Sequence, residues 1–198
     1  MKQNKPHIGL LFGSFNPIHT GHLIIASLMI EEVGFDKIWF VVSPQNPFKK
    51  SNQLADYQHR VEMVKLGIKA DARFDLCTVE DSLPKPNYTI ETLGHLNDSY
   101  SQFQFSIILG SDNLSGLEKW KNSEKLIKEN SFYVYHRAGF EPGIYKQMGQ
   151  FHFFEFPLLN ISSTYIRQLI DEGKSIKYLV PEGVMNYIQS QKIKFING

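Results

Sequence analysis

The sequence predicts an α/β fold in which a single doubly wound, mostly parallel sheet is flanked by helices. Short apolar runs, typical of buried strands, alternate with longer segments whose apolar residues recur at helical spacing. Such alternation favours a parallel sheet, because neighbouring parallel strands need helical connections with right-handed crossovers. The 198 residues, 42% of them hydrophobic, suffice for one substantial core, so we expect a single domain over residues 1–198.

The elements follow one another in the order that this fold requires. The apolar run 8–12 predicts the first buried strand, and a helix follows from about Gly21. Gly34 stands where a left-handed residue would end that helix. The rest of the chain predicts strand 38–42, a polar loop over 43–53, helix 56–70, strand 74–79, helix 89–97, strand 103–109, two short helices within 112–129, strands 132–135 and 151–156, and helices 163–172 and 181–189.

Composition excludes several classes of protein. Lys plus Arg number 21 and Asp plus Glu 20, so no global basic excess points to a nucleic acid. No apolar stretch approaches the roughly 18 residues of a membrane span, and Gly13 and Pro17 interrupt the first apolar run too early for a signal peptide. The single cysteine, Cys77, fits a reducing compartment and a buried apolar position. We therefore expect a cytoplasmic protein with neither nucleic acid nor membrane as partner; a homo-oligomer is left open.

The segment Gly-Ser-Phe-Asn-Pro-Ile-His-Thr-Gly-His over residues 13–22 links the first strand to the first helix. Backbone N–H groups and the helix dipole favour an anion there, and phosphate is the natural guest. Gly13 and Gly21 remove side chains where chain and ligand approach closely. His19 and His22, three residues apart, can face the same side and donate hydrogen bonds to phosphate oxygens. An isolated histidine more often packs or caps, but here these features coincide.

A second anion-binding pattern lies near the C-terminus. Ser162, Ser163 and Thr164 stand at a predicted helix start, and Arg167 follows one turn later, where it can point at the same anion. Taken alone, the hydroxyls are also ordinary helix caps, and a surface arginine is common. The pattern therefore predicts a phosphate contact only together with the first loop.

Both segments resemble known signatures. Segment 13–22 resembles the HxGH signature of the nucleotidyltransferase superfamily related to class I aminoacyl-tRNA synthetases, and its full form is similar to the bacterial nicotinate mononucleotide adenylyltransferase family. Segment 161–167 resembles the second superfamily signature, ISSTxxR. The resemblance implies a Rossmann-like fold and a role for the histidines in stabilising charge at the α-phosphorus of ATP. The ATP site that it implies comprises Gly13, Ser14, Phe15, His19, His22, Ser162, Ser163, Thr164 and Arg167.

The middle of the chain resembles the acceptor site of that family. Tyr88 and Thr89 follow Asn87 as in its SYT-type motif, where amides at a helix start contact the nicotinate carboxylate. Segment 108–112, followed by Trp120, resembles the pattern IGxD…W, in which the tryptophan stacks on the pyridine ring; a core tryptophan is the alternative. Asp112 could hold a ribose hydroxyl or a metal-bound water, or simply cap a helix.

Two further segments resemble the family with substitutions. Segment 43–49 resembles a loop that usually ends Pro-His-Lys; Phe48 replaces the histidine, so only Lys49 is carried over. Segment 136–140 resembles Arg-Arg-Pro-Gly-Tyr, and Arg137 remains a candidate for binding the acceptor phosphate or the ATP phosphates. The acceptor site that the resemblance implies comprises Asn16, Lys49, Tyr88, Thr89, Asp112, Trp120 and Arg137.

The resemblance implies transfer of AMP from ATP to nicotinate mononucleotide, which gives nicotinate adenine dinucleotide and pyrophosphate in NAD biosynthesis. The acceptor phosphate, with a second pKa of about 6, can attack without a general base. Catalysis then rests on positioning and on cationic or donor groups, for which we expect His19, His22, Lys49 and Arg167. Mg²⁺ would bind mainly through the ATP phosphates, with no protein metal site.

Two alternatives remain open. The acceptor could be nicotinamide mononucleotide or another phosphorylated small molecule, or the chain could be a non-catalytic nucleotide-binding module. The intact His19, His22 and Arg167 argue against the module, because a sensor need not retain all three.

Overall fold

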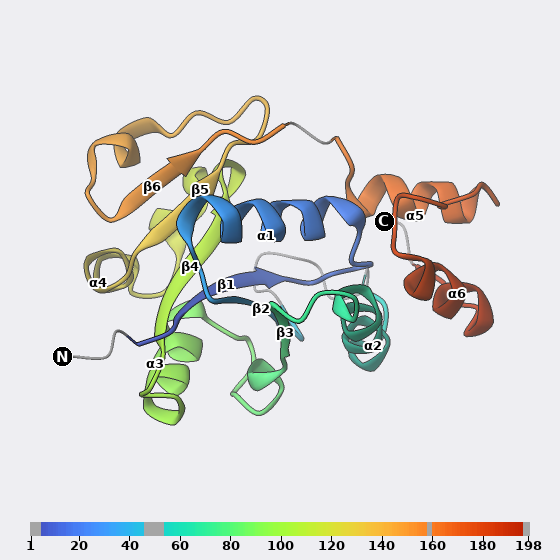
Figure 1. The fold of residues 1–198 in the computed structure, drawn as a ribbon, viewed down its shortest axis with the longest axis horizontal. Coiled ribbons are helices and arrows are strands. Elements are labelled where there is room, and N and C mark those ends of the chain that lie inside the picture. Colours follow the sequence, from blue (N-terminus) through green and yellow to red (C-terminus); the bar gives the residue numbers. More distant parts are fainter. Residues whose placement is uncertain (1–4, 46–53, 158–159, 196–198) are drawn as a thin grey trace.

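The computed structural model describes residues 5–45, 54–157 and 160–195. A sheet of six strands runs in the order β3-β2-β1-β4-β5-β6, and each neighbouring pair is parallel. The predicted parallel, doubly wound sheet is therefore confirmed, and Figure 1 shows its strands between helices. The strands are β1 (His7–Gly13), β2 (Lys37–Val42), β3 (Phe74–Cys77), β4 (Gln104–Gly110), β5 (Phe132–Tyr135) and β6 (Phe151–Phe154).

The helices also follow the predicted order, with small differences at their ends. Val79, predicted to end a strand, begins a short 3₁₀ helix instead, and the first helical pattern after β4 is a 3₁₀ helix rather than an α-helix. The short helix η4 was not predicted. The helices are α1 (Thr20–Val33), α2 (Tyr57–Ile68), η2 (Val79–Asp81), α3 (Thr89–Ser99), η3 (Ser111–Lys119), α4 (Ser123–Glu129), η4 (Gly143–Gln147), α5 (Ser163–Asp171) and α6 (Glu182–Ser190).

Each face of the sheet is covered by a separate apolar cluster, as a parallel sheet requires. On one face, α1 and α2 pack against Leu11 and Phe40 of the sheet. On the other, α3, η3 and α4 pack against Leu10 and Ile107. Cys77 is buried in this second cluster, as expected. Burial on both faces explains why the strands read as continuous apolar runs rather than as alternating ones.

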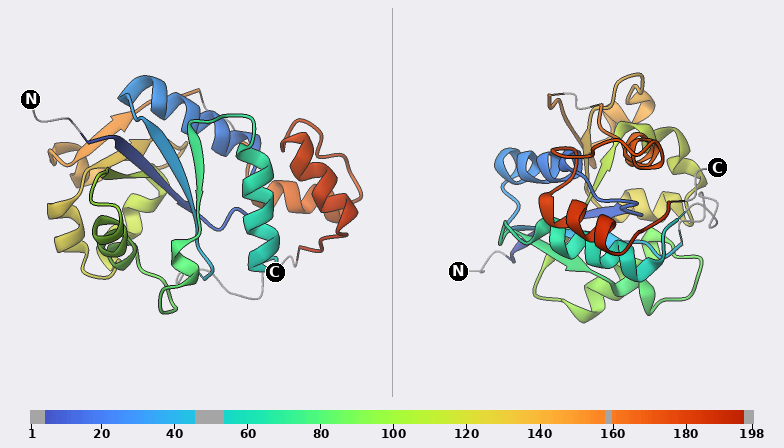
Figure 2. Two further views of the ribbon diagram at one scale, coloured as in Figure 1. Left: turned by 60° about the horizontal axis from the view of Figure 1, so that its bottom comes forward. Right: turned by 90° about the vertical axis from the view of Figure 1, so that its right-hand side faces the viewer.

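The last two helices extend the structure beyond the carboxyl ends of the strands. Figure 1 shows α5 and α6 at the end toward which β1 runs, and Figure 2 shows them beside α2. Val184 and Ile188 of α6 are buried in the cluster that includes α2. The start of α1 is tied to the same region, because the Thr20 N–H donates to the Leu179 carbonyl at 2.9 Å. The segment before α6 thus contacts the start of α1, next to the loop that follows β1.

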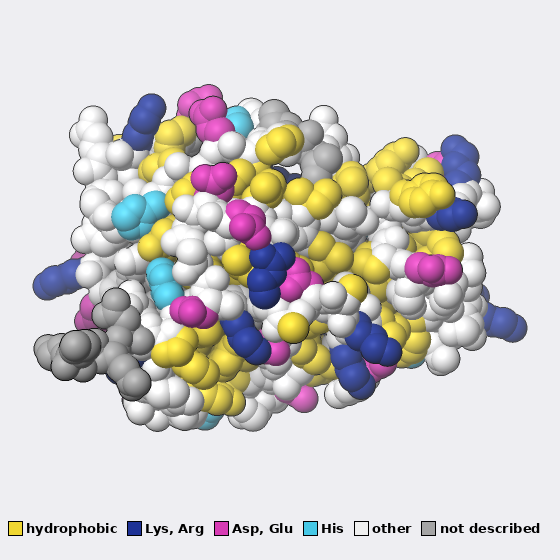
Figure 3. Space-filling view, in the orientation of Figure 1, with side chains coloured by type: hydrophobic (Ala, Val, Ile, Leu, Met, Phe, Trp, Pro, Cys, Tyr) yellow, Lys and Arg dark blue, Asp and Glu magenta, His cyan; other side chains and the backbone are white. Residues whose placement is uncertain are grey.

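The surface agrees with the balanced composition. On the face seen in Figure 3, basic and acidic side chains lie interspersed, as expected for 21 Lys plus Arg against 20 Asp plus Glu. Among the described residues, no helix combines the length and the apolar character needed to cross a bilayer.

Two glycines provide a matched test of backbone conformation. Gly34 ends α1 with a φ of 77°, whereas Gly94 lies inside α3, and a Cβ added at either would meet nothing within 4 Å. Gly34→Ala should lower the free energy of unfolding by about 1 kcal/mol, because alanine is strained at positive φ. Gly94→Ala should raise it by roughly 0.5–1 kcal/mol. Urea denaturation of both variants measures the two signs, and equal signs would contradict this reading of the cap.

Candidate active site

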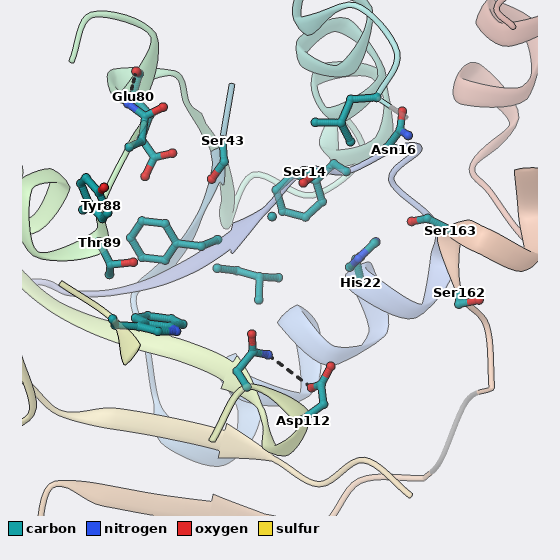
Figure 4. A pocket seen from close by; sticks show the side chains of 18 of the residues that line it. Ser14, Asn16, His22, Ser43, Glu80, Tyr88, Thr89, Asp112, Ser162 and Ser163 are labelled. Atoms are coloured by element: carbon teal, nitrogen blue, oxygen red, sulfur yellow. Dashed lines mark hydrogen bonds between the residues drawn. The ribbon is translucent and has the colours of Figure 1, made fainter. Parts of the chain in front are cut away.

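A cavity of about 760 Å³ opens at the carboxyl ends of the strands, where ligands collect in sheets of this topology. In Figure 4, Tyr88, Thr89 and Glu80 lie toward one end of it, and His22, Ser162 and Ser163 toward the other. Every described residue that the sequence analysis assigned to the ATP or acceptor site lines this cavity: Gly13, Ser14, Phe15, Asn16, His19, His22, Tyr88, Thr89, Asp112, Trp120, Arg137, Ser162, Ser163, Thr164 and Arg167. Lys49, and Phe48 beside it, lie outside the described residues.

In the loop between β1 and α1, here called the first loop (residues 14–19), two aromatic side chains pack against the glycines that flank it. Phe15 has a φ of 45°, unusual for a residue other than glycine, and its ring is buried. A Cβ at Gly13 would lie 2.8 Å from that ring, and one at Gly21 would lie 3.1 Å from the His19 ring. The sequence analysis explained both glycines by the approach of a ligand. The structure adds a steric reason within the protein itself.

The two histidines of the first loop and α1 form a stacked pair. Their ring centroids lie 3.7 Å apart with an angle of 26° between the planes. The backbone N–H of His19 donates to Nδ1 of His22 at 3.2 Å. Nδ1 of His22 is therefore an acceptor, so in the neutral ring the proton sits on Nε2, a tautomer inferred from this bond. The stack places both imidazoles on the cavity wall, as their spacing predicted.

The buried His19 ring is neutral rather than cationic at neutral pH. Its side chain is 5% exposed, and Nδ1 has no hydrogen-bond partner within the described chain. Burial lowers the pKa of His19 to about 4, and the charge of Arg137 acts in the same direction. Of the two roles predicted for His19, the cationic one is disfavoured at neutral pH, and donation to phosphate stays a prediction.

Arg167 and the start of α5 are bonded to the first loop. The Ser163 hydroxyl donates to the Pro17 carbonyl at 2.9 Å, and Nη1 of Arg167 donates to the Asn16 carbonyl at 3.0 Å. Nε of Arg167 is buried and has no partner within the described chain. The second anion-binding pattern therefore meets the first, although they are far apart in the sequence.

The hydroxyls of this segment differ in what they do. Ser162 is a true helix cap, since its Oγ accepts from the N–H of Tyr165 at 3.2 Å. Thr164 is exposed and accepts at Oγ1 from Nη2 of Arg167 at 3.2 Å. The cap interpretation is therefore confirmed for Ser162, whereas a phosphate contact from these hydroxyls stays a prediction.

The ends of β4 and β5 contribute an ion pair to the cavity wall. Asp112 and Arg137 approach to 3.3 Å, and the backbone N–H of Arg137 donates to the Ser111 hydroxyl at 2.9 Å. No side chain caps η3, so the cap interpretation of Asp112 does not hold. An ion pair thus joins the segment after β4 to the segment after β5.

Trp120 and the start of α3 form the aromatic part of the wall. Tyr88 is the residue before α3, and Thr89 is the first residue of that helix. Trp120, at the end of η3, is half-buried and lines the cavity, so it is not the fully buried core residue of the alternative interpretation. An aromatic surface and a helix N-terminus therefore share one end of the cavity.

Comparison with known proteins agrees with this geometry. The cytidylyltransferase-like family model matches residues 10–169. A Cytophaga hutchinsonii protein named "Probable nicotinate-nucleotide adenylyltransferase" is 45% identical over 93% of this chain and 96% of its own. The chain belongs to the nicotinate-nucleotide adenylyltransferase family. A Bacteroides fragilis member of the same name is 39% identical over 94% of this chain and 93% of its own.

A solved structure shows the same fold. The Plasmodium falciparum nicotinic acid mononucleotide adenylyltransferase complexed with NaAD superposes with a TM-score of 0.79. It is 22% identical, and the match covers 94% of this chain and 96% of that one. The Rossmann-like nucleotidyltransferase fold expected from the signatures is confirmed.

Buried polar residues behind the family's signature positions, Glu80 and Thr92 among them, were not predicted from the sequence. Glu80 is 2% exposed, and its Oε1 accepts from the Thr92 hydroxyl at 2.9 Å. Burial raises the pKa of the Glu80 carboxyl, which these hydrogen bonds only partly offset. Asn87 donates from Nδ2 to the Glu80 carbonyl at 2.8 Å, and it lines the cavity together with Ser43. The position of Glu80 just after β3, at the same sheet edge as the other loops, could have revealed it.

Lys121 was also missed, since a lysine after Trp120 looks like a solvated neighbour. Its Nζ lies 4.5 Å from the centroid of the Tyr88 ring and 2.5 Å from a carboxylate oxygen of Glu91. These contacts join the segment after η3 to the first turn of α3. Lys121 thus places a cation at the aromatic end of the cavity.

The depressed pKa of His19 makes stability depend on pH. Because the unfolded chain binds this proton with a pKa near 6.5 and the folded chain near 4, stability is fully present above pH 6.5 and falls as the pH drops to 4. We expect the wild type to lose about 3 kcal/mol more than His19→Gln between pH 7 and pH 4. Denaturant titrations at both pH values measure this difference. A His19 ring that titrates near 6.5 by NMR would contradict it.

Proposed function

We propose that the protein transfers AMP from ATP to nicotinate mononucleotide, giving nicotinate adenine dinucleotide and pyrophosphate. One observation carries the proposal: the cavity has His22 and the start of α5 toward one end and the start of α3 toward the other, and His19, Arg167 and Trp120 also line it. The first end suits a polyphosphate, and the second suits a planar ring that bears an anion. The names of the similar proteins from other organisms support the same reaction.

The triphosphate would lie against the first loop, the start of α1 and α5. The buried neutral His19 would donate one hydrogen bond, and His22 would donate from Nε2. Arg167, already bonded to the first loop, would turn part of its guanidinium to phosphate oxygens, since its Nε has no partner within the described chain. These groups lie where charge builds on the α-phosphate and on the leaving pyrophosphate.

The acceptor would lie with its pyridine ring against Trp120 and its carboxylate at the start of α3. The backbone amides of Tyr88 and Thr89 offer donors and a positive dipole, to which Lys121 adds a charge. Arg137 would hold the acceptor phosphate, because Asp112 keeps its guanidinium at the end of β5. This arrangement aims the acceptor phosphate toward the histidine end.

The reaction needs no general base from the protein. The acceptor phosphate is mostly a dianion at neutral pH, so one of its oxygens attacks the α-phosphorus while the bond to pyrophosphate breaks. A dianion must then approach a tetra-anion, and their electrostatic repulsion opposes this approach. The cavity would lower the repulsion by holding both anions between hydrogen-bond donors. The carboxylates that line the cavity fit this picture, since Asp112 is paired with Arg137 and burial disfavours the charged form of Glu80.

The residues fit a Mg²⁺ ion that arrives with ATP. Among the described residues, no group of three or more His, Cys, Asp or Glu could hold a metal. The ion would therefore bind mainly through phosphate oxygens and water, with Asp112 placed to hold one of those waters. When bound, it neutralises part of the phosphate charge.

The organisation of the chain and its location are parts of the same proposal. Residues of α1 and of α6 share one apolar cluster, which supports a single domain rather than a separate C-terminal unit. The buried, unpaired Cys77 fits the reducing cytoplasm.

Pyrophosphate release with ATP and each acceptor in turn tests the proposal. Nicotinate mononucleotide should be used at least tenfold more efficiently than nicotinamide mononucleotide, because the carboxamide NH₂ meets donors and loses a charge-assisted bond. Trp120→Ala should lower kcat/KM for both acceptors in similar proportion, since stacking contacts only the ring face. Equal kcat/KM values on the wild type would indicate dual specificity, and no pyrophosphate release with either would point to a non-catalytic module.

His22→Ala should lower kcat by roughly 10²–10³-fold, because it removes a donor to the transition-state charge. The ring is only partly buried, so the free energy of unfolding should change little by comparison. Single-turnover kinetics beside thermal denaturation separates the two effects. Near wild-type turnover from a folded variant would remove His22 from the proposed mechanism.

A further inference from the structure

Arg60 of α2 is among the largest fully buried side chains of the protein, with 1% of its surface exposed. It lies on the buried face of α2, together with Met63, Val64 and Gly67, where an apolar residue is expected. A buried guanidinium is costly unless its hydrogen bonds and charge are satisfied. Its contacts therefore indicate what it does.

The guanidinium donates only to backbone carbonyls. Nη1 donates to the Ser14 carbonyl at 2.7 Å and to the Ser43 carbonyl at 2.8 Å. Nη2 donates to the Pro44 carbonyl at 2.9 Å, and Nε to the Ala55 carbonyl at 3.1 Å. One side chain thus joins the first loop, the end of β2 and the start of α2.

Among the described residues, no carboxylate is hydrogen-bonded or ion-paired with Arg60, and Asp56 at the start of α2 acts on its charge only through space. None of its hydrogen bonds reaches an acid, and the Tyr57 ring, 5.4 Å away, is its cation–π neighbour. An arginine keeps its charge at physiological pH even where burial lowers its pKa, as it does here. A positive charge therefore lies directly behind Ser14 and Ser43, both of which line the cavity.

The bond to Ser14 also orients a peptide group. In a trans peptide the carbonyl and the following N–H point in opposite directions. Because the Ser14 carbonyl points at Arg60, the N–H of Phe15 points away from it, on the side where Ser14 and Phe15 line the cavity. The φ of 45° at Phe15 shows that this turn is held in a conformation that the residue alone disfavours.

We propose that Arg60 is a positioning residue of the triphosphate site: it turns the Phe15 N–H toward the bound phosphates and supplies a buried positive charge behind them. The identity of the anion rests on the proposed function; the geometry does not. A bound polyanion then adds the negative charge that no hydrogen-bonded carboxylate supplies to Arg60. A residue that merely joined three segments would contribute to stability alone.

Arg60→Lys and Arg60→Gln separate these roles. Lysine keeps the charge but cannot reach four carbonyls, whereas glutamine keeps a donor and loses the charge. Arg73→Gln is the matched control, because Arg73 also makes several bonds, but its partners Asp71 and Glu31 do not line the cavity as Ser14 and Ser43 do. All variants are measured well below their melting temperatures, with the fold checked by circular dichroism.

Calorimetry with ATP, inorganic pyrophosphate and adenosine provides the readout. For Arg60→Gln we expect affinity for ATP and pyrophosphate to fall by about tenfold or more, with adenosine binding and the KM of the acceptor nearly unchanged. Arg60→Lys should keep more of the ATP affinity than Arg60→Gln at equal or lower stability, and Arg73→Gln should affect stability only. Wild-type affinity for ATP in folded Arg60→Gln, or equal losses in both Arg60 variants, would overturn the proposal.

A measurement on the wild type covers the case in which the variants do not fold. With ¹⁵N-labelled phenylalanine, the Phe15 amide resonance should shift on addition of pyrophosphate and not of adenosine. An unchanged resonance at saturating pyrophosphate would overturn the proposed orientation. If the wild type binds neither ATP nor pyrophosphate, the proposed function itself fails; if it binds both and the Arg60 variants match it, only the role of Arg60 fails.

Discussion

The first loop is held by three side-chain donors, one from α2 and two from α5, and the shape of the cavity wall depends on these hydrogen bonds. Arg60 holds the Ser14 carbonyl, Arg167 holds the Asn16 carbonyl and Ser163 holds the Pro17 carbonyl. Because these three carbonyls are engaged by the protein, the loop cannot turn them toward a bound polyanion, which their partial negative charge would repel. With these three acceptors occupied, the loop and the start of α1 present the imidazoles of His19 and His22 to the cavity.

Much of the fold could be predicted because its signals are local. Apolar runs marked the strands, and Gly34 marked the end of α1 through its need for a positive φ. The two short helical patterns after β4 were also recognised, but η3 is a 3₁₀ helix, which apolar spacing alone does not distinguish from an α-helix over so short a segment. Val79 was misplaced for a similar reason, since a β-branched apolar residue also fits the start of a turn.

Residues of the cavity wall could be predicted where a residue type suited to phosphate binding stands at the end of a strand or the start of a helix. Histidines at a strand-to-helix loop and hydroxyls at a helix start can be recognised from the sequence alone as candidate phosphate-binding residues. Arg60, Glu80 and Lys121 do not, because their roles depend on contacts with segments remote in the chain. The protonation of His19 was equally out of reach, since its pKa depends on burial and on Arg137 rather than on its neighbours in the sequence.

The bonds between the first loop and α5 join residues 146 and 151 positions apart. A ribosome makes the first loop long before α5, so the growing chain carries His19 and His22 without Arg167 and Ser163, which hold that loop, until α5 has been made. The N-terminal strands can pair during that time, since domains begin to fold as they emerge. A polypeptide released before α5 would therefore hold the strands of the sheet without two of the three donors that fix the first loop.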